Sequence, residues 1–498
     1  MRWQKQLGII CILIFAISCS QNDIPATPTQ TPQPTATQTL PPTAVPTTEP
    51  TSAGPTATPE PSFGQFPYQN RSLPTAERVE DLLSRMSLDE KIGQMTLVEK
   101  DSIQPDGVAR LGIGAILSGG GGGPVDNSAE GWLEMVTDYQ VAALETDLQI
   151  PLLYGVDAVH GHSNVTDATI FPHNIGLGAA RNPELVHDIA RATALETLAT
   201  GIHWNYAPVL AVPRDIRWGR TYEGFSENTD LVTELATAHL IGLQGVDGES
   251  DLGHPETLLG TPKHFIGDGG TEWGSSTTDN FKIDQGVTAI DEETLRSIHL
   301  PPYPAAIEAG AMSMMASYSS WGGIKMHGQK YLMTNVLRDE LGFEGFIVSD
   351  WKAIDQVDPD YYTAVVTSIN AGIDLNMVPY DYNAFIRTMK TAVNNGDISK
   401  ERIDEAVGRI LYAKFELGLF EQPFGDEALL QTVGSSEHRD LGRQAVRESL
   451  VLLQNKNDAL PLSAETSRIF VSGIGADDLG LQSGGWTLEW QGFNGKKT

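Results

Sequence analysis

The stretch Gly342-Phe343-Glu344-Gly345-Phe346-Ile347-Val348-Ser349-Asp350-Trp351 holds an apolar run that ends abruptly in an acid and an indole. The run is too short for a helix and is typical of a buried parallel strand. In barrels and open parallel sheets, catalytic groups lie at the carboxyl ends of the strands. Asp350 is therefore the first candidate for a catalytic group. The alternative is that it only caps the following helix.

Similar apolar segments that end in polar or aromatic residues recur along the chain. They are Gln94–Glu99, Ile113–Gly119, Leu152–Asp157, His203–Leu210, Leu259–Phe265, Ser313–Tyr318, Phe346–Asp350 and Ile373–Val378. Helical patterns such as Asn182–Thr200 and Thr229–Leu243 separate most of them, which indicates parallel strands joined by crossover helices. Eight such units predict an α/β protein built as a (β/α)₈ TIM barrel with long loops. Ser87 and Glu90 predict a capping box at the start of a helix.

The ends of these segments carry many polar groups. Asp157 follows the third segment, Arg220 lies in the loop after the fourth, Lys263 and His264 lie on the fifth, and Tyr318 ends the sixth. In a barrel these groups converge on one mouth, where charged groups can bridge the hydroxyls of a sugar and rings can stack on its C–H faces. For Arg220 the alternative is a simple ion pair with Glu223 or Asp215. For His264 the alternative is an ordinary place in the core.

Several of these motifs together resemble glycoside hydrolase family 3, especially its exo-β-glucanases and β-glucosidases. The matching segments are Glu77–Met86, Tyr154–Gly161, Arg217–Arg220, Lys263–Phe265 and Ser349–Trp351, and the resemblance runs from about Thr75 to the last residue. It implies a TIM barrel followed by an α/β sandwich, with the active site between them. It also implies a retaining, exo-acting β-glucosidase that releases terminal glucose from neutral β-glucans or oligosaccharides and needs no cofactor.

The resemblance implies a role for each of several residues. Asp350 is similar to the nucleophile of the family, which forms a glycosyl-enzyme that water releases with retention of configuration. The residues that resemble the binders of the terminal glucosyl unit are Asp157, Arg220, Lys263, His264 and Tyr318. Trp351 and Trp490 look like the two indoles that clamp the next sugar, and the alternative for Trp490 is packing within the second domain. Lys263 and Arg220 are expected to help keep a nearby carboxylate ionised.

Three further segments of the sequence argue against a phosphate site, a metal site and N-acetylglucosaminidase activity. Gly119–Gly123 is followed by no Gly-Lys-Ser/Thr, so it predicts a flexible loop at the barrel mouth rather than a phosphate site. His160 and His162 follow a strand but have no further ligand cluster beside them, so we predict no metal site. The loop Ile266–Thr271 lacks the Gly-His-Gly and Asp-Ser-His of the family's N-acetylglucosaminidase branch, which disfavours that branch.

The amino terminus predicts export to the periplasm or cell surface. Basic residues precede the apolar stretch Leu7–Ile17, which is too short to span a membrane and has the layout of a secretory signal. Ala16–Cys19 resembles a lipoprotein box, so residues 1–19 are the expected signal peptide and Cys19 the expected lipid anchor in the membrane; ordinary cleavage nearby is the alternative. The only other cysteine, Cys11, lies inside this signal, so the exported chain can form no internal disulfide.

Composition predicts how the rest of the chain is divided. Residues 20–64 are rich in Thr, Pro, Ala and Ser, which predicts a disordered stalk between a lipid anchor and a catalytic domain. Residues 65–422 are the expected barrel, 423–440 a linker and 441–498 part of the α/β sandwich. The formal charge of −31 argues against nucleic acid and anionic polysaccharides as partners and is compatible with a neutral glucan.

The second domain is expected to be incomplete. The sequence predicts an amphipathic helix over Arg439–Leu453 and a first strand over Arg468–Gly473. Family members continue well beyond Gly484–Gly492, and their general acid/base is a glutamate in that later part, whose absence removes a contribution of ~10²–10⁴-fold. Glu223 and Glu489 are candidates for a substitute acid. The rival interpretations are a catalytically impaired glycan-binding lipoprotein and, within the family, a β-xylosidase; the sequence does not indicate an oligomeric state.

Overall fold

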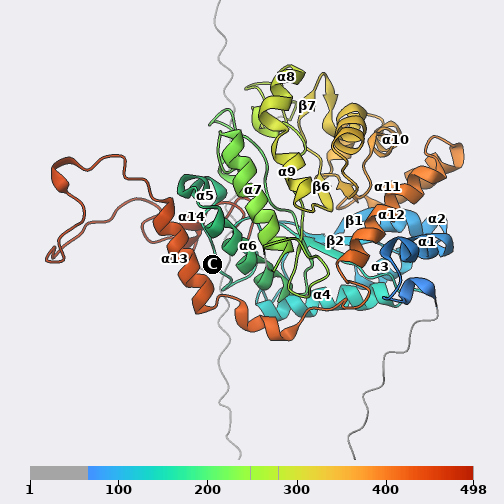
Figure 1. Cartoon of the computed structure of the whole chain (residues 1–498), viewed down its shortest axis with the longest axis horizontal. Helices are drawn as coiled ribbons and strands as arrows, with labels where there is room; N and C mark the ends of the chain where they lie inside the picture. Colours follow the sequence, from blue (N-terminus) through green and yellow to red (C-terminus); the bar gives the residue numbers. More distant parts are fainter. Residues whose placement is uncertain (1–65, 247, 279, 497–498) are drawn as a thin grey trace, which may run out of the picture. The chain divides into compact units, whose positions relative to one another are not determined.

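The computed structural model describes residues 66–246, 248–278 and 280–496. The expected signal peptide, the lipidation site Cys19 and the Thr/Pro-rich stalk lie outside these residues. Figure 1 shows the described chain as an α/β structure with its strands in the interior. In the described ranges, no helix combines the length and the apolar character that crossing a membrane requires.

All eight predicted strands are present, and each is shorter than the apolar segment that predicts it. They are β1 (Thr96–Glu99), β2 (Ala115–Ser118), β3 (Leu153–Val156), β4 (Trp204–Asn205), β5 (Leu259–Gly260), β6 (Ser313–Met315), β9 (Phe346–Val348) and β10 (Asn376–Met377). Every residue in them is buried, which is why continuous apolar runs mark them in the sequence. The register pairs Ile116 with Tyr154 and Val156 with Asn205.

The strands are parallel and follow one another around a ring in chain order. Six of them form one sheet in the order β10-β1-β2-β3-β4-β5, and β6 pairs with β9. Two parallel bridges connect these sheets: Phe265 after β5 pairs with Ala316 after β6, and Val348 in β9 pairs with Leu375 before β10. The result is a parallel, barrel-like sheet whose carboxyl ends gather at one mouth. An antiparallel hairpin that the sequence does not predict, β7 (Ser320–Trp321) and β8 (Ile324–Lys325), follows β6.

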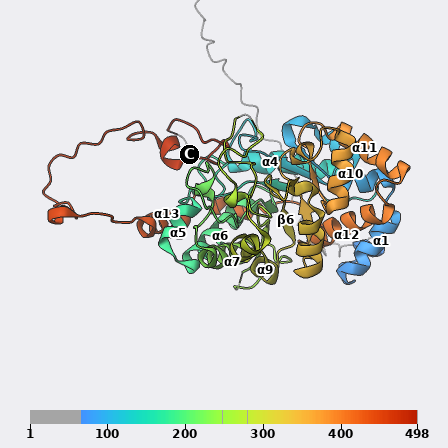
Figure 2. The ribbon, with the colours of Figure 1, turned by 90° about the horizontal axis from the view of Figure 1, so that it is seen from above.

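Helices surround the strands, as Figures 1 and 2 show. The longer ones are α1 (Thr75–Arg85), α4 (Ala129–Leu144), α6 (Pro183–Leu198), α7 (Thr229–Gln244), the π-helix η7 (Tyr331–Glu340), α10 (Tyr361–Ala371), α11 (Tyr382–Asn395), α12 (Lys400–Glu416) and α13 (Ser436–Ser449). The shorter ones are α2 (Leu88–Gln94), α3 (Pro105–Leu111), α5 (Asn174–Ala180), α8 (Glu292–Thr294), α9 (Pro302–Glu308) and α14 (Leu479–Ser483). Both helices predicted between strands, α6 and α7, are present.

The capping box predicted at the start of α2 is confirmed. The Ser87 hydroxyl accepts a hydrogen bond from the amide of Glu90 at 3.3 Å, and the Glu90 carboxylate accepts one from the amide of Ser87 at 2.7 Å. The two residues thereby satisfy amide groups that the first turn of a helix leaves free. This cap sets where α2 begins and therefore where β1, two residues after its end, enters the sheet.

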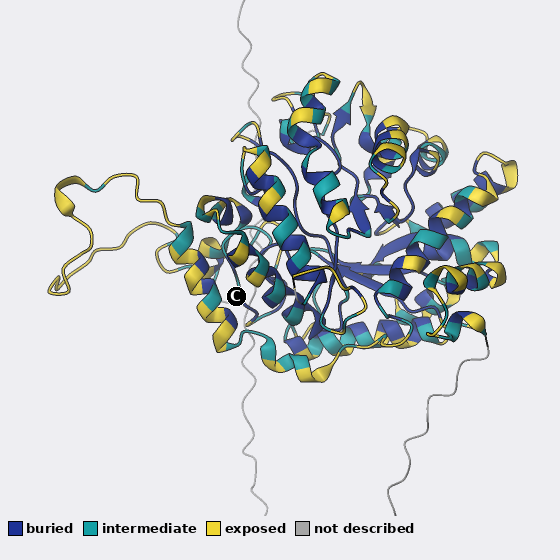
Figure 3. Ribbon diagram, viewed as in Figure 1, coloured by how far each residue is buried: buried dark blue, intermediate teal, exposed yellow. Residues whose placement is uncertain are grey.

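The core fills the space between the strands and the helices. One apolar cluster joins Leu97 and Leu153 of the strands to Ile410 of α12. A second cluster joins Leu235 of α7 to Phe265, which follows β5. Figure 3 shows the same division, with buried residues along the strands and exposed residues on the outer helix faces. Helices on the outside and apolar strands inside leave the strand ends as the place for polar side chains.

The buried carboxylate of Asp374 anchors β9 near its beginning. Asp374 accepts hydrogen bonds from Arg338 Nη2 at 2.5 Å and from Arg402 Nη2 at 2.7 Å. It also accepts one from the amide of Ile347 in β9 at 2.9 Å. Burial acts to raise the pKa of Asp374, but the neighbouring guanidinium groups outweigh burial and lower it. The carboxylate therefore stays charged and joins β9 to two helices.

The ammonium group of Lys414 closes the amino-terminal ends of three strands. This buried side chain on α12 donates hydrogen bonds to Gln94 Oε1 at 2.7 Å and to the carbonyl oxygens of Gly114 and Pro151 at 2.8 Å. These acceptors precede β1, β2 and β3, respectively. Burial lowers the pKa of Lys414 to about 7, and the protonated amine has three donors, one for each of these acceptors.

The carboxyl-terminal part departs from its prediction in the bounds of a helix and in the absence of a strand. The helix predicted over 439–453 is present as α13, which begins three residues earlier, ends at Ser449 and packs against α5 and α6. The predicted strand over 468–473 is absent: the segment has no regular secondary structure and is exposed, with Phe470 90% exposed. Among the described residues no strand lies beside it, and an isolated strand has no partner for its backbone hydrogen bonds. Figure 3 shows the chain between α13 and α14 exposed along most of its length.

We expect Lys414→Met to destabilise the protein by at least about 2 kcal/mol, because three buried acceptors lose their donor. Urea unfolding followed by circular dichroism measures this loss. Lys400→Met, an exposed position on the same helix, is the matched control and should change stability by less than about 0.5 kcal/mol. Equal stability of the two variants would contradict this role for Lys414.

Candidate active site

The carboxyl ends of the strands open into a cavity of about 730 Å³. Every residue that the sequence singles out for sugar chemistry lines this cavity: Asp157, Arg220, Lys263, His264, Tyr318, Asp350, Trp351 and Trp490. Most of them follow a barrel strand directly or lie in the loop after it, whereas Trp490 comes from the segment after α14. Residues far apart in the sequence therefore meet because parallel strands end at the same edge.

Asp157 and Lys263 form an ion pair on one wall of the cavity. Lys263 Nζ donates to Asp157 Oδ1 at 2.6 Å, and both side chains are largely buried. Asp157 directly follows β3, and Lys263 follows β5. Because each charge is matched by the other, both can remain at a poorly hydrated site, where they offer a charged acceptor and a charged donor to a ligand.

Arg220 pairs with Glu223 and also reaches the cavity. Its guanidinium donates two hydrogen bonds to the Glu223 carboxylate, each of 2.8 Å, and a third to His264 Nε2 at 3.1 Å. Of the two ion pairs considered from the sequence, the one with Glu223 is formed, whereas Asp215 binds Arg217 instead. Burial raises the pKa of Glu223, but Arg220 outweighs burial and brings it to about 2. Glu223 is therefore ionised at neutral pH.

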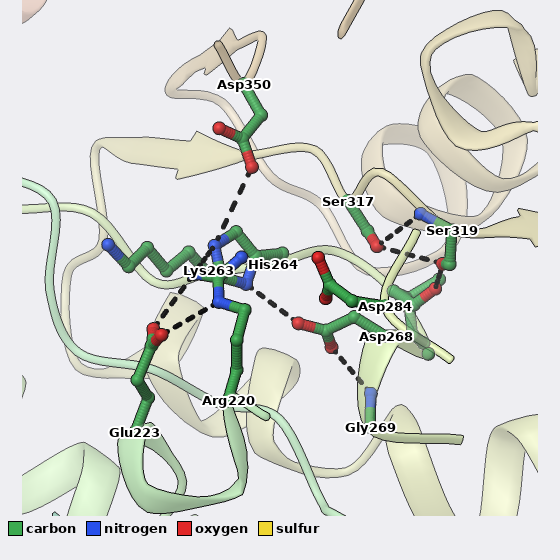
Figure 4. A network of polar contacts seen from close by, with 12 residues as sticks. Arg220, Glu223, Lys263, His264, Asp268, Gly269, Asp284, Ser317, Ser319 and Asp350 are labelled. Atoms are coloured by element: carbon green, nitrogen blue, oxygen red, sulfur yellow. Dashed lines mark hydrogen bonds and ion pairs between the residues drawn. The ribbon is translucent and has the colours of Figure 1, made fainter. Parts of the chain in front are cut away.

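His264 connects Arg220, Asp268 and Asp350, as Figure 4 shows. Its Nε2 accepts from Arg220, so its Nδ1 carries the hydrogen and donates to Asp268 Oδ2 at 2.8 Å. Burial and the nearby cations Arg220 and Lys263 hold the pKa of His264 well below its usual value. The ring is therefore neutral and fixed in one tautomer, more constrained than an ordinary core histidine.

Asp350 presents a carboxylate oxygen without a partner. Its side chain is 14% exposed, and Oδ1 accepts from the amide of Trp351 at 2.6 Å. Oδ2 is buried and finds no hydrogen-bond partner among the described residues, and His264 Nε2 lies 3.8 Å from it. Burial raises the pKa of Asp350 to about 6, although the charges of Arg220 and Lys263 act to lower it. The two cations lower the pKa of Asp350, as expected from the sequence, but burial raises it by more.

His327 holds the backbone of Asp350 in place. Its Nε2 accepts a hydrogen bond from the amide of Asp350 at 3.0 Å. His327 lies in the short helix η6 (Met326–Gly328), which follows the β7–β8 hairpin, and its ring is buried. Burial lowers the pKa of His327 to about 3, so Nε2 keeps the lone pair that this hydrogen bond requires. The sequence does not single out His327, since nothing in its spacing relates it to Asp350.

Two tryptophans stand at the outer part of the cavity, against the glycine-rich loop after β2. A Cβ atom added to Gly119 would lie 3.1 Å from the Trp351 ring, and one added to Gly120 would lie 2.5 Å from the Trp490 backbone nitrogen. Only residues without a side chain allow this approach at position 120. Gly119–Gly123 thus lies at the mouth, as the sequence predicts, and serves as a packing surface for both indoles. Trp490 contacts the barrel loop and is 41% exposed.

The segment that carries Trp490 also brings Trp486 to the cavity. The carbonyl oxygen of Trp486 accepts from Ser163 Oγ at 2.5 Å, and His173 Nε2 donates to the carbonyl oxygen of Gly485 at 2.8 Å. The Trp486 ring centre lies 5.5 Å from Lys263 Nζ. The segment is therefore attached to the barrel by polar contacts, and it covers the ion pair of Asp157 and Lys263.

Sequence reasoning misses other residues that line the cavity. They are Glu99, Asp101, Ser102, Leu117, Phe281, Asp284, Gln285, Met315, Met377, Tyr380 and Trp486. Glu99 ends β1, so the strand-end rule that found Asp157 could also have found it. Asp284 and Gln285 lie in a long loop without periodicity, where no sequence signal marks them. Within the described ranges, no three His, Cys, Asp or Glu side chains are arranged to hold a metal ion.

We expect Asp350→Asn to be more stable than the parent chain at pH 7, because it removes a poorly hydrated charge and keeps Oδ1 as an acceptor. The folded chain has the higher pKa for Asp350, so protonation favours folding: its stabilising effect is complete below pH 4 and is lost as pH rises through about 6. The gain from the substitution should therefore be up to about 3 kcal/mol at pH 7 and should vanish near pH 4.

Urea unfolding at pH 4, 5, 6, 7 and 8 measures this difference. Asp251→Asn, at an exposed loop position, is the control and should show no such dependence on pH. A gain that stays the same from pH 4 to pH 8 would contradict the raised pKa of Asp350.

Comparison with known proteins supplies the family. The chain matches the glycosyl hydrolase family 3 N-terminal domain over residues 87–413. It is 34% identical over 444 residues to the lysosomal beta glucosidase of Dictyostelium discoideum, covering 83% of this chain and 53% of that protein. It is 30% identical over 444 residues to the periplasmic beta-glucosidase of Salmonella typhimurium, covering 86% and 54%.

Among solved structures, a mutant of exo-1,3/1,4-beta-glucanase from a Pseudoalteromonas species is similar, with a TM-score of 0.78 and 43% sequence identity. That match covers 84% of this chain and 67% of the other. The chain spans about half the length of the curated relatives named above. The parallel sheet, the polar strand ends and these matches agree, and the chain belongs to glycosyl hydrolase family 3.

Proposed function

We propose that this chain is a retaining, exo-acting β-glucosidase that releases terminal glucose from neutral β-glucans or oligosaccharides. The observation that carries the proposal is Oδ2 of Asp350, a buried carboxylate oxygen that no described residue engages, at a cavity lined by cations, acids and indoles. Membership of the family supports it, as do relatives described as beta-glucosidases and an exo-1,3/1,4-beta-glucanase.

Asp350 is the nucleophile in this proposal. Its Oδ2 attacks the anomeric carbon of the terminal sugar while the bond from that carbon to the leaving oxygen breaks, which gives a glycosyl ester. Water then attacks the same carbon, the carboxylate leaves, and the proton that the water loses balances the one that the departing sugar takes up. Two displacements at one carbon retain its configuration. The amide of Trp351 donates to the Asp350 carboxylate, and the amide of Asp350 donates to the His327 ring. These two hydrogen bonds hold the carboxylate in place for both steps.

The terminal sugar lies against the charged wall in this proposal. Asp157, Lys263, Arg220 and His264 offer charged or polar atoms to its hydroxyl groups, and Tyr318 lies beside them. Ion pairing already orients these groups before a ligand arrives, so little ordering is needed on binding. The barrel interior beneath them is filled by side chains, which leaves room for the end of a glucan and not for a chain passing through. Trp351 and Trp490 then flank the next sugar.

Glu223 is unsuited to donate the proton that the leaving sugar needs. It is paired with Arg220, and its pKa of about 2 leaves it ionised at neutral pH. The resemblance to the family assigns the donor to a glutamate that follows Gly484–Gly492 in family members. A nitrophenolate departs without such a donor, so an activated aryl glucoside tests Asp350 independently of the acid.

Export and membrane attachment form the last part of the proposal. The apolar stretch Leu7–Ile17 and the lipoprotein-like box ending in Cys19 support an exported protein anchored by a lipid. The Salmonella relative, described as periplasmic, is in keeping with export. We also propose that the barrel domain ends at residue 422 and that a linker runs from there to residue 440.

Labelling with 2,4-dinitrophenyl 2-deoxy-2-fluoroglucoside tests the assignment of the nucleophile. The fluorine slows both displacements while the good leaving group permits the first, so the ester accumulates. We expect mass spectrometry to place one adduct on Asp350 and none on an Asp350→Asn chain. An adduct on another acid would contradict the assignment. Absence of both labelling and nitrophenol release would favour a glycan-binding protein, and faster release from an aryl xyloside would favour a β-xylosidase.

We expect His327→Ala to lower kcat for an aryl glucoside by about 10- to 100-fold with little change in KM, because the nucleophile loses its backbone anchor while the sugar contacts remain. His327→Gln should recover part of the loss, since its amide oxygen can accept the same hydrogen bond. The matched control is His239→Ala, a buried histidine on α7 whose ring nitrogens have no hydrogen-bond partner among the described residues. Equal effects of the two alanine variants on kcat would refute a positioning role for His327.

A further inference from the structure

Trp273 is an exposed tryptophan in the loop that also supplies Asp284 to the cavity lining. The residue is 48% exposed, whereas Trp132, Trp204 and Trp218 are buried. The guanidinium of Arg217 lies over the ring, with its central carbon 4.5 Å from the ring centre. One face of the indole is therefore covered by a cation, and nearly half of the residue remains accessible. Trp273 does not line the cavity itself.

The stack of Arg217 on Trp273 is held in a fixed arrangement. Arg217 Nε donates to Asp215 Oδ1 at 2.9 Å, and Arg217 Nη2 donates to Asp215 Oδ2 at 2.5 Å. A bidentate pair of this kind fixes the plane of a guanidinium group. It also balances the charge of Arg217, so the surface formed by Arg217 and Trp273 is flat and locally neutral. We call these two side chains the rim platform.

The rim platform is linked to the cavity wall through Trp218 and Asp284. Trp218, the residue after Arg217, donates from Nε1 to Asp284 Oδ1 at 2.8 Å, and Asp284 lines the cavity. Trp273 and Asp284 belong to the same loop, whose base is joined by the hydrogen bond from the amide of Glu272 to the carbonyl of Val287 at 2.9 Å. The loop that carries Arg217 and Trp218 thus meets the loop that carries Trp273 and Asp284 at two places. One is the hydrogen bond between Trp218 and Asp284, and the other is the rim platform.

The chemistry of the rim platform suits a neutral sugar. An indole face packs against the C–H face of a sugar ring, and a guanidinium edge offers donors to its hydroxyl groups. We propose that the rim platform binds a glucosyl unit of a longer β-glucan, beyond the two units nearest the cleavage point. This inference rests on the proposed function, which places the non-reducing end of the glucan in the cavity. It adds a binding site outside the cavity, which short substrates do not reach.

Calorimetric titration of the full chain carrying Asp350→Asn tests the inference without turnover. Glucose, laminaribiose and laminaritetraose are the ligands, and Trp273→Ala is added to the same chain. We expect the added substitution to lower the affinity for laminaritetraose by about three- to tenfold and to change the affinities for glucose and laminaribiose by less than about twofold. Trp273→Phe should keep most of the affinity for laminaritetraose because it keeps a flat aromatic face.

The matched control is Phe424→Ala, which removes another aromatic side chain of similar exposure, 45%, away from the cavity lining. This control substitution should leave the affinities for all three ligands unchanged. If Trp273→Ala weakens the binding of glucose, laminaribiose and laminaritetraose equally, the rim platform only supports the cavity wall. If it weakens the binding of none of them, the rim platform binds no sugar. Either result overturns the inference and leaves the proposed function standing. Failure of the Asp350→Asn chain to bind glucose and laminaribiose overturns both.

Discussion

The structure depends on how charges are compensated where the parallel strands end. Burying an isolated carboxylate or ammonium group is costly, so such groups persist only when they are paired or hydrogen-bonded. Asp157 is paired with Lys263 and Glu223 with Arg220, and Asp268 accepts a hydrogen bond from the neutral ring of His264. Asp350 is the exception, because one of its carboxylate oxygens has no hydrogen-bond partner in the described part of the chain. The uncompensated oxygen marks the place where a ligand would complete the arrangement.

Strand β9, which ends two residues before Asp350, is anchored within the strand and beyond its end. At its middle residue, the amide of Ile347 donates to Asp374, whose carboxylate two arginines also bind. Beyond its end, the amide of Asp350 donates to His327. Both anchors come from outside the strand, and both are buried. A carboxylate with a raised pKa is unfavourable to folding at neutral pH, so rigid support on both sides is what keeps it in position.

The mouth of the cavity depends on close backbone approach more than on charge. The loop at Gly119 and Gly120 lets Trp351 and the backbone of Trp490 come within contact distance. Ser163 and His173 attach the segment of Trp486 to the barrel by hydrogen bonds. Loops of the barrel and the segment after α14 therefore share one wall. The rim platform extends this arrangement outward, with an ion pair holding a guanidinium against an indole.

The sequence by itself determined the parallel α/β framework, because strands buried on both faces must be continuous apolar runs. It also located the lining residues that lie at strand ends or in recognisable motifs, such as Asp157, Lys263 and Asp350. It could not determine the strand expected at 468–473, because a strand exists only beside another strand.

Only the tertiary structure decided which groups compensate one another and which do not. Neither the choice of Glu223 over Asp215 as the partner of Arg220 nor the hydrogen bond from Asp350 to His327 follows from spacing. Asp284 and Trp273 lie in a loop without periodicity, so their places at the wall and the rim emerge only when two loops meet. The physical reason is range: local patterns report which face of an element is buried, whereas pKa values, unpaired atoms and binding surfaces depend on residues that are distant in the chain and near in space.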